Sequence, residues 1–117
     1  MQQADEQGVA HISLECSIYV AQAMIQNHDN AQAQQELRRT LLRADKLGLK
    51  PLSAKAHYLL ATSLRASGNQ EAQQHYRETQ QLLDEMRKEP GAENILQRWD
   101  FKTMYDEASR WGQADKK

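Results

Sequence analysis

The stretch that most constrains the fold is residues 53–84, where two apolar stripes flank a short polar break. Apolar and small residues recur every three or four positions on both sides, which places them on one face of a helix. In the break, Gly68 suits the left-handed conformation that ends a helix, and Asn69 suits the cap of the next. The sequence therefore predicts a helical hairpin. Its inward positions are Ala56, Leu60, Ala61 and Leu64, then Ala72, Tyr76, Thr79, Leu83 and Met86.

Composition extends this prediction to the whole chain. The 117 residues are enough for one domain with a single core. Only 6% of them are aromatic, so the core depends on Ala and Leu. Residues that favour helices dominate, and β-branched residues are scarce. We expect an all-α fold of stacked antiparallel hairpins.

The breaks along the chain give its organisation. Residues 1–9 are polar and predicted to be frayed, residues 10–48 form a first hairpin, and residues 51–88 form the second. Glu89, Pro90 and Gly91 then interrupt the pattern. Residues 92–112 are predicted to be capping helices, and residues 113–117 a tail.

The first hairpin is predicted to contain helices over about residues 9–27 and 31–47. Asp29 or Asn30 is the expected cap of the second of these helices, Gly48 its end, and Pro51 suits the first turn of the next. The inward residues expected on the first helix are Ile12, Cys16, Val20, Ala23 and Met24, with a second stripe through Ile18, Tyr19 and Ile25. Those expected on the second helix are Ala33, Leu37, Thr40, Leu41, Ala44 and Leu47.

The last helix is expected to start after a cap at Asp100 and to end at Gly112. Its apolar stripe is Phe101, Met104, Tyr105, Ala108 and Trp111. Trp99 lies just before it, so both tryptophans of the chain fall in this segment. Large aromatic residues at one end suit a terminal cap on an Ala-rich stack.

The two hairpins repeat one another at an offset of about 39 to 40 residues. Leu37 corresponds to Tyr76, Ala21 to Ala61, and Met24 to Leu64. In the second copy the series of large, small and turn residues resembles the tetratricopeptide repeat family. The residues that carry the resemblance are His57, Leu60, Ala61, Leu64, Gly68, Ala72, Tyr76 and Thr79. Small residues at Ala61 and Ala72 allow two helices to approach closely.

The chain departs from the family pattern at several places. His57 stands where the family has Trp, and Asp84 where Pro closes the repeat. In the first copy, Asn27 and His28 replace the turn glycine. The resemblance covers about residues 10–88 and implies a short right-handed superhelix. Residues 46–52 also look like repeats at the end of bacterial multidomain regulators.

Charge and cysteine content exclude several classes of protein. Fifteen basic and sixteen acidic residues give a net charge of −1, which disfavours a nucleic-acid or anionic membrane surface. No apolar run is long enough to span a bilayer, and the polar start is unlike a signal peptide. Cys16 is the only cysteine, which fits a reducing compartment, so we expect a cytoplasmic location.

No pattern in the sequence indicates an active site, a metal site or a cofactor. None of the four histidines stands in metal-ligand spacing with another, and the glycines are isolated rather than grouped in a phosphate loop. The acidic pairs have basic neighbours, which is typical of a solvated surface. No serine lies in a nucleophile elbow. We expect a protein that is not an enzyme.

A binding surface is the better hypothesis. In the family that the repeats resemble, the first helix of each repeat lines a groove for a protein or peptide. Transferring those positions gives a partner-binding groove of Ile18, Tyr19, Gln22, Lys55, Tyr58, Leu59, Thr62 and Arg65. Tyrosine is a residue type enriched at binding hot spots. Ile18 and Gln22 occupy two places of the set by which some relatives bind a terminal carboxylate, so that role is not expected.

Two further interpretations follow from the small number of repeats. Repeat arrays generally need about three units to bury enough surface. An exposed stripe of Ile12, Ile18 and Ile25 would therefore be covered by a second copy in a homodimer, or by upstream repeats. The alternative function is a small-molecule sensor, with a ligand bound between helices.

Overall fold

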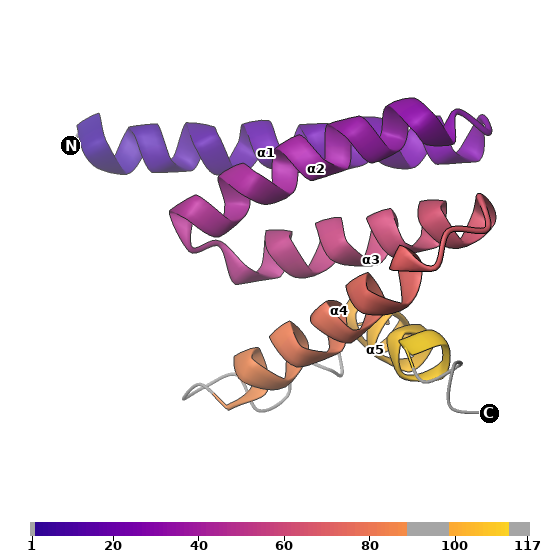
Figure 1. Cartoon of the computed structure of the whole chain (residues 1–117). Helices are drawn as coiled ribbons and strands as arrows, with labels where there is room; N and C mark the ends of the chain where they lie inside the picture. Colours follow the sequence, from indigo (N-terminus) through magenta and orange to yellow (C-terminus); the bar gives the residue numbers. More distant parts are fainter. Residues whose placement is uncertain (1, 89–98, 113–117) are drawn as a thin grey trace.

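The computed structural model describes residues 2–88 and 99–112. This part of the chain is helical and contains no strand, so the all-α prediction is confirmed. Figure 1 shows the helices in chain order. They are α1 (Gln2–Gln26), α2 (Asn30–Leu47), α3 (Lys50–Ala66), α4 (Glu71–Arg87) and α5 (Trp99–Gly112).

The first four helices form two antiparallel hairpins that lie one on the other. α1 and α3 run in one direction and α2 and α4 in the opposite one, with α2 between α1 and α3, and α4 on the far side of α3 (Figure 1). Each helix packs mainly on the next one in the chain, and α1 also contacts α3. α5 packs on α4 and crosses α3 obliquely, so that it is seen nearly end-on in Figure 1.

The turns form where the sequence predicts them. Gly48 has φ 72° and Gly68 has φ 75°, the left-handed region that glycine adopts at low cost. The Asn69 Oδ1 atom accepts a hydrogen bond from the Glu71 amide at 2.9 Å and so caps α4. Pro51 lies in the first turn of α3, as expected. Asp29 precedes α2, although its side chain makes no capping hydrogen bond.

The second hairpin has the core that the sequence predicts. All nine of its expected inward residues, from Ala56 to Met86, are buried. Tyr76 is the largest fully buried side chain, at 0% exposure. Ala61 and Ala72 are buried between α3 and α4, where small side chains permit close approach of the two helices.

The main inner stripe predicted for α1 is wrong, although Ile18 and Ile25 of the predicted second stripe do pack in the core. Leu14, Ile18 and Ala21 are buried, whereas Ile12 is 61% exposed and Val20 is 49% exposed. The predicted inner residues Cys16 and Ala23 are also exposed, and Met24 is only half-buried. α1 carries apolar residues around most of its circumference, so spacing alone does not define which stripe faces the core.

The remaining predictions for the first hairpin hold in part. Ala33, Leu37, Thr40 and Ala44 are buried and Leu41 is half-buried, but Leu47 is exposed. The exposed stripe predicted for a partner is also wrong in two of its three residues. Ile18 is buried, and Ile25 packs against the core. α1 begins at Gln2, so residues 2–9 are helical rather than frayed.

The last helix covers the second hairpin. Phe101, Met104 and Ala108 are buried, and Tyr105 and Trp111 are half-buried against the core, as predicted. Asp100 lies inside α5, so it is not the residue that precedes the helix. The short helix expected over residues 92–98, the tail and the Trp99 side chain lie outside the described residues. Among the described helices, none has the length and apolar character needed to cross a lipid bilayer.

Candidate binding groove

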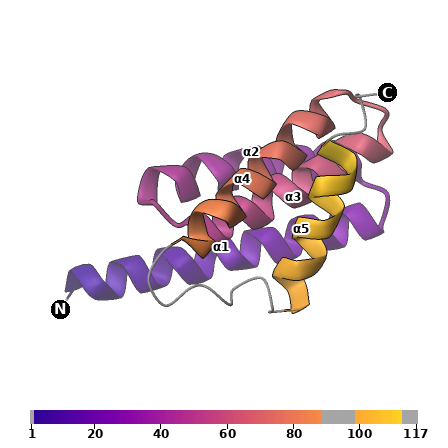
Figure 2. The ribbon, with the colours of Figure 1, turned by 90° about the horizontal axis from the view of Figure 1, so that it is seen from below.

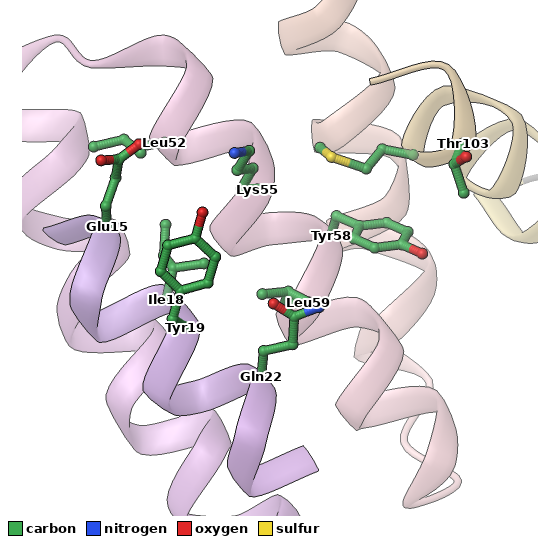
Figure 3. Close-up of a pocket in the computed structure, with 10 residues that line it drawn as sticks. Glu15, Ile18, Tyr19, Gln22, Leu52, Lys55, Tyr58, Leu59 and Thr103 are labelled. Carbon is green, nitrogen blue, oxygen red and sulfur yellow. The ribbon is translucent and has the colours of Figure 1, made fainter. Parts of the chain in front are cut away.

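A groove of about 330 Å³ lies where α1, α3 and α5 meet. Figure 3 shows α1 and α3 side by side along it, with α5 beyond them. α1 and α3 run in the same direction, and each presents about one side chain per turn to the groove. The lining residues are Glu15, Ile18, Tyr19, Gln22, Leu52, Lys55, Tyr58, Leu59, Thr103 and Met104.

The floor of the groove is apolar and fixed. Ile18, Leu52 and Leu59 are buried, and they come from the two hairpins. Met104 of α5 is also buried and adds a flexible thioether side chain. Because these residues are already packed in the core, an apolar side chain of a ligand can bind to them without a prior rearrangement of the protein.

Two tyrosines rise above this floor. Tyr19 on α1 is 63% exposed, and Tyr58 on α3 is half-buried (Figure 3). The Tyr58 hydroxyl donates a hydrogen bond to Glu107 Oε1 at 2.7 Å, which joins α3 to α5. Burial raises the pKa of Tyr58, and the hydrogen bond to Glu107 raises it further, so the phenol stays protonated. Tyr58 is therefore held in place, whereas Tyr19 can adjust to a ligand.

Charged side chains stand at one end of the groove. Glu15 and Lys55 lie there on facing helices (Figure 3). The Lys55 Nζ atom lies 5.9 Å from the centre of the Phe101 ring, within cation–π range. The groove therefore combines an apolar floor, aromatic walls and one polar end.

Six of the eight residues predicted for the groove line it. Thr62 and Arg65 do not. The Thr62 hydroxyl donates to the Tyr58 carbonyl oxygen at 2.9 Å, and the Arg65 guanidinium lies over the Trp111 ring, 4.1 Å from its centre. Thr62 and Arg65 lie farther along the same face of α3, toward its C-terminal end.

Four lining residues lie outside the predicted set: Glu15, Leu52, Thr103 and Met104. Leu52 lies about one turn before Lys55 and two turns before Leu59 on the same face of α3, so its spacing could have identified it. Thr103 and Met104 come from α5, which is outside the repeat. Where α5 crosses α3 is decided by packing, and no periodicity in the sequence encodes it.

The structure also brings together two histidines that sequence spacing leaves apart. His57 Nδ1 and His75 Nδ1 are 2.9 Å apart between α3 and α4, so one ring donates a hydrogen bond to the other. Burial lowers the pKa of His57, although nearby Asp45 opposes this shift. Burial also lowers the pKa of His75, and the neighbouring His57 and Arg38 lower it further. Both rings are therefore neutral at pH 7.

The two rings do not form part of a larger ligand set. Across residues 2–88 and 99–112, no group of three or more His, Cys, Asp or Glu side chains is arranged to hold a metal ion. The Glu78 Oε1 atom lies 4.0 Å from His57 Nε2. The pair is best described as a buried contact between α3 and α4.

Comparison with known proteins adds no assignment. No protein-family model matches the chain, and no significant match to it is found among curated proteins or among solved structures. The likeness to tetratricopeptide repeats therefore rests on the repeat residues alone.

Proposed function

We propose that the chain is a non-catalytic, tetratricopeptide-like module that binds a protein or peptide segment in the groove between α1, α3 and α5. One observation supports this most strongly. Residues 40 positions apart in the two repeats, such as Ile18 with Tyr58 and Tyr19 with Leu59, line one common groove. An extended ligand in the groove would therefore contact equivalent positions of both repeats.

The chemistry of the groove favours a peptide over a charged polymer. Interface hot spots are enriched in tyrosine and lie over desolvated apolar pockets, and Tyr19 and Tyr58 stand over such a floor. The near-neutral net charge gives little attraction for nucleic acid or for anionic lipid. We place the module in the cytoplasm, within a larger bacterial regulatory or signalling protein and in a right-handed repeat superhelix.

Selection from a phage-displayed library of random dodecapeptides tests the proposal. We expect the chain to enrich peptides that share one large apolar residue. The Tyr19→Ala substitution should weaken their binding about tenfold or more, which corresponds to ~1.4 kcal/mol. Leu42→Ala removes an equally exposed apolar side chain on α2 and should leave binding unchanged. A library that yields no enriched peptide, or peptides indifferent to Tyr19→Ala, contradicts the proposal.

The size of the groove supports a second candidate, a small-molecule sensor. A volume of about 330 Å³ lies at the lower end of the range for small-ligand pockets, about 300–1,000 Å³. A thermal-shift screen against a metabolite collection separates the two functions. A metabolite that raises the melting temperature of the wild type, but not of Tyr19→Ala, favours the sensor.

The outer face of α1 supports self-association as a further part of the proposal. Val9, Ile12, Cys16 and Tyr19 are exposed and spaced alternately by three and four residues. This is the spacing by which one helix packs against an identical helix. The occupant we propose for this face is α1 of a second copy, and its test is given at the end of the Discussion.

A further inference from the structure

A second hollow, of about 460 Å³, opens where the end of α3, the start of α4 and the end of α5 meet. It follows the groove along α3, because Arg65 is two turns beyond Tyr58 on the same side of that helix. Unlike the groove, it is lined mainly by polar side chains. These are Arg65, Asn69, Gln70, Gln73 and Tyr76, together with Ala72 and Trp111.

The Arg65 guanidinium is held at this hollow by two contacts. Its central carbon lies 4.1 Å from the centre of the Trp111 ring, which is a stacking distance. Its Nε atom donates to the Tyr76 hydroxyl at 3.3 Å, and that hydroxyl lies 3.2 Å from the Thr62 Oγ1 atom. Tyr76 is fully buried, so the network is anchored in the core. An arginine oriented in this way loses little entropy when it binds a ligand.

The fixed guanidinium presents donors to the hollow. With Nε bonded to Tyr76, the hydrogens on the terminal nitrogens Nη1 and Nη2 remain for a ligand, and two such hydrogens match the oxygens of a carboxylate. The Asn69 Oδ1 atom accepts from the Glu71 amide, which leaves the Asn69 amino group as a further donor at the hollow. The hollow therefore offers a ligand one positive charge and several hydrogen-bond donors.

No acidic side chain is among the residues that line this hollow. Glu71 lies nearby in the first turn of α4, but its carboxylate is 3.1 Å from Arg38 on α2 and forms an ion pair there. Glu107 of α5, one turn before Trp111, accepts the Tyr58 hydrogen bond. A ligand carboxylate is therefore attracted at Arg65 and repelled near Tyr58, where Glu107 carries its negative charge.

We propose that the hollow at Arg65 is a carboxylate subsite of the peptide groove, and that the partner is a peptide with an acidic residue near its apolar anchor. This inference rests on the proposed function, because the anchor is the side chain that fills the groove. Leu59 and Arg65 are six residues apart, or about 9 Å along α3. An extended peptide covers that distance in about three residues. The acidic residue therefore stands about three positions from the anchor.

The test compares matched peptides that differ at a single acidic position. Dodecapeptides selected by the wild-type chain are synthesised with Asp at the predicted position and with Asn in its place. We expect the wild type to prefer the Asp peptide about tenfold in fluorescence polarisation. Arg65→Gln should abolish that preference, and Arg65→Lys should retain only part of it, because lysine cannot stack or bind in a bidentate manner.

Matched controls separate a local effect from a change in net charge or in folding. Arg39→Gln removes the same charge from α2, where the side chain is 70% exposed, and should leave the preference unchanged. Arg65 is exposed, so loss of its contacts with Trp111 and Tyr76 should lower the melting temperature by only a few degrees, and binding is measured well below that temperature.

The outcomes distinguish the two proposals. Apolar peptides that bind equally well with Asp or Asn support the groove and overturn the carboxylate subsite. A preference for Asp that persists in Arg65→Gln also overturns the subsite, because the charge is then recognised elsewhere. If no peptide is enriched at all, the proposed function fails and the subsite fails with it.

Discussion

The two hairpins share one layout but differ in how much of their surface is covered. α3 packs between α2 and α4 and also contacts α1 and α5. Ten of its 17 residues are buried, so an apolar residue chosen on this helix is rarely an exposed one. α1 packs on α2 and, less extensively, on α3, and a full apolar stripe remains exposed on it (Figure 2 shows its free N-terminal end). The same apolar spacing therefore predicts burial only where neighbouring helices lie on both sides.

The turns of the two hairpins give a second contrast. Gly68 ends α3 with φ 75°, and His28, 40 residues earlier, follows α1 with φ 64°. The backbone hydrogen bonds match as well. The Asn69 amide donates to Leu64 O at 2.8 Å, and the Asp29 amide donates to Met24 O at 2.7 Å. The two turns therefore share one geometry, which Gly68 adopts at low cost and His28 adopts at a steric cost.

The largest expected change in the free energy of unfolding comes from a substitution on α1, and it shows which face of that helix is buried. Leu14→Ala should lower the free energy of unfolding by ~3 kcal/mol, because it leaves a cavity in the core. Ile12→Ala, two residues away, should change it by less than ~0.5 kcal/mol. Urea denaturation at low protein concentration measures both without a contribution from self-association. Equal losses in the two variants would mean that both stripes of α1 are covered.

The second hairpin could be predicted almost completely from its sequence. Its turn holds a glycine, Asn69 caps the next helix, and α3 is buried on most sides, so the apolar stripe chosen on it faces the core. α1 could not be predicted in the same way, because two stripes there are equally apolar. Leu14 and Ala21 became inner residues because α2 and α3 lie against them, which is a property of the packed structure.

The groove could be predicted for the same reason as the repeat. Once the offset of 40 residues is known, Ile18 corresponds to Tyr58 and Tyr19 to Leu59, so both repeats supply residues to one groove. Met104 and Thr103 could not be found, since the path of α5 is not part of the repeat. The contact between His57 and His75 was equally hidden, because their spacing of 18 residues places them together only after the α3–α4 turn has formed.

The next effect concerns the histidine pair, which only the second hairpin contains. Burial lowers the pKa of both rings below the unfolded value of 6.5, so the unfolded chain binds more protons as the pH falls through that value. Stability is therefore highest above about pH 6.5 and decreases below it. We expect a loss on the order of 1 kcal/mol between pH 7 and pH 5.

Thermal unfolding across that pH range measures this loss. The double variant His57→Gln/His75→Gln should lose the part of the slope that the two rings contribute. His28→Asn, an exposed turn residue replaced by one that tolerates positive φ, should keep the wild-type slope. An unchanged slope in the double variant would mean that other groups cause the acid sensitivity.

A smaller effect is expected at the two turns, with opposite signs. Gly68→Ala should destabilise the protein by ~1 kcal/mol, because alanine is strained at positive φ. His28→Gly should stabilise it by ~0.5–1 kcal/mol, since the relief of strain exceeds the entropy cost of glycine. Chemical denaturation of the two variants measures both changes. A His28→Gly variant that is less stable than the wild type would show that the imidazole contributes more than the strain costs.

The smallest effect on stability belongs to the outer face of α1, where the expected change is in association. Ile12→Lys places a charge in the centre of the exposed stripe and should leave the melting temperature of the monomer within about 1 °C of the wild type. Sedimentation velocity should show a dimer for the wild type at micromolar concentration and a monomer for this variant. Leu42→Lys, at a 74% exposed residue on α2, should still dimerise.

Because the stripe alternates by three and four residues, an antiparallel pair places Ile12 opposite Cys16 of the second copy, whereas a parallel pair places the two Cys16 residues together. Oxidative cross-linking of the wild type would therefore indicate the parallel pair, and cross-linking that requires Ile12→Cys would indicate the antiparallel one. A wild type that sediments as a monomer contradicts self-association and leaves the groove as the only binding surface proposed.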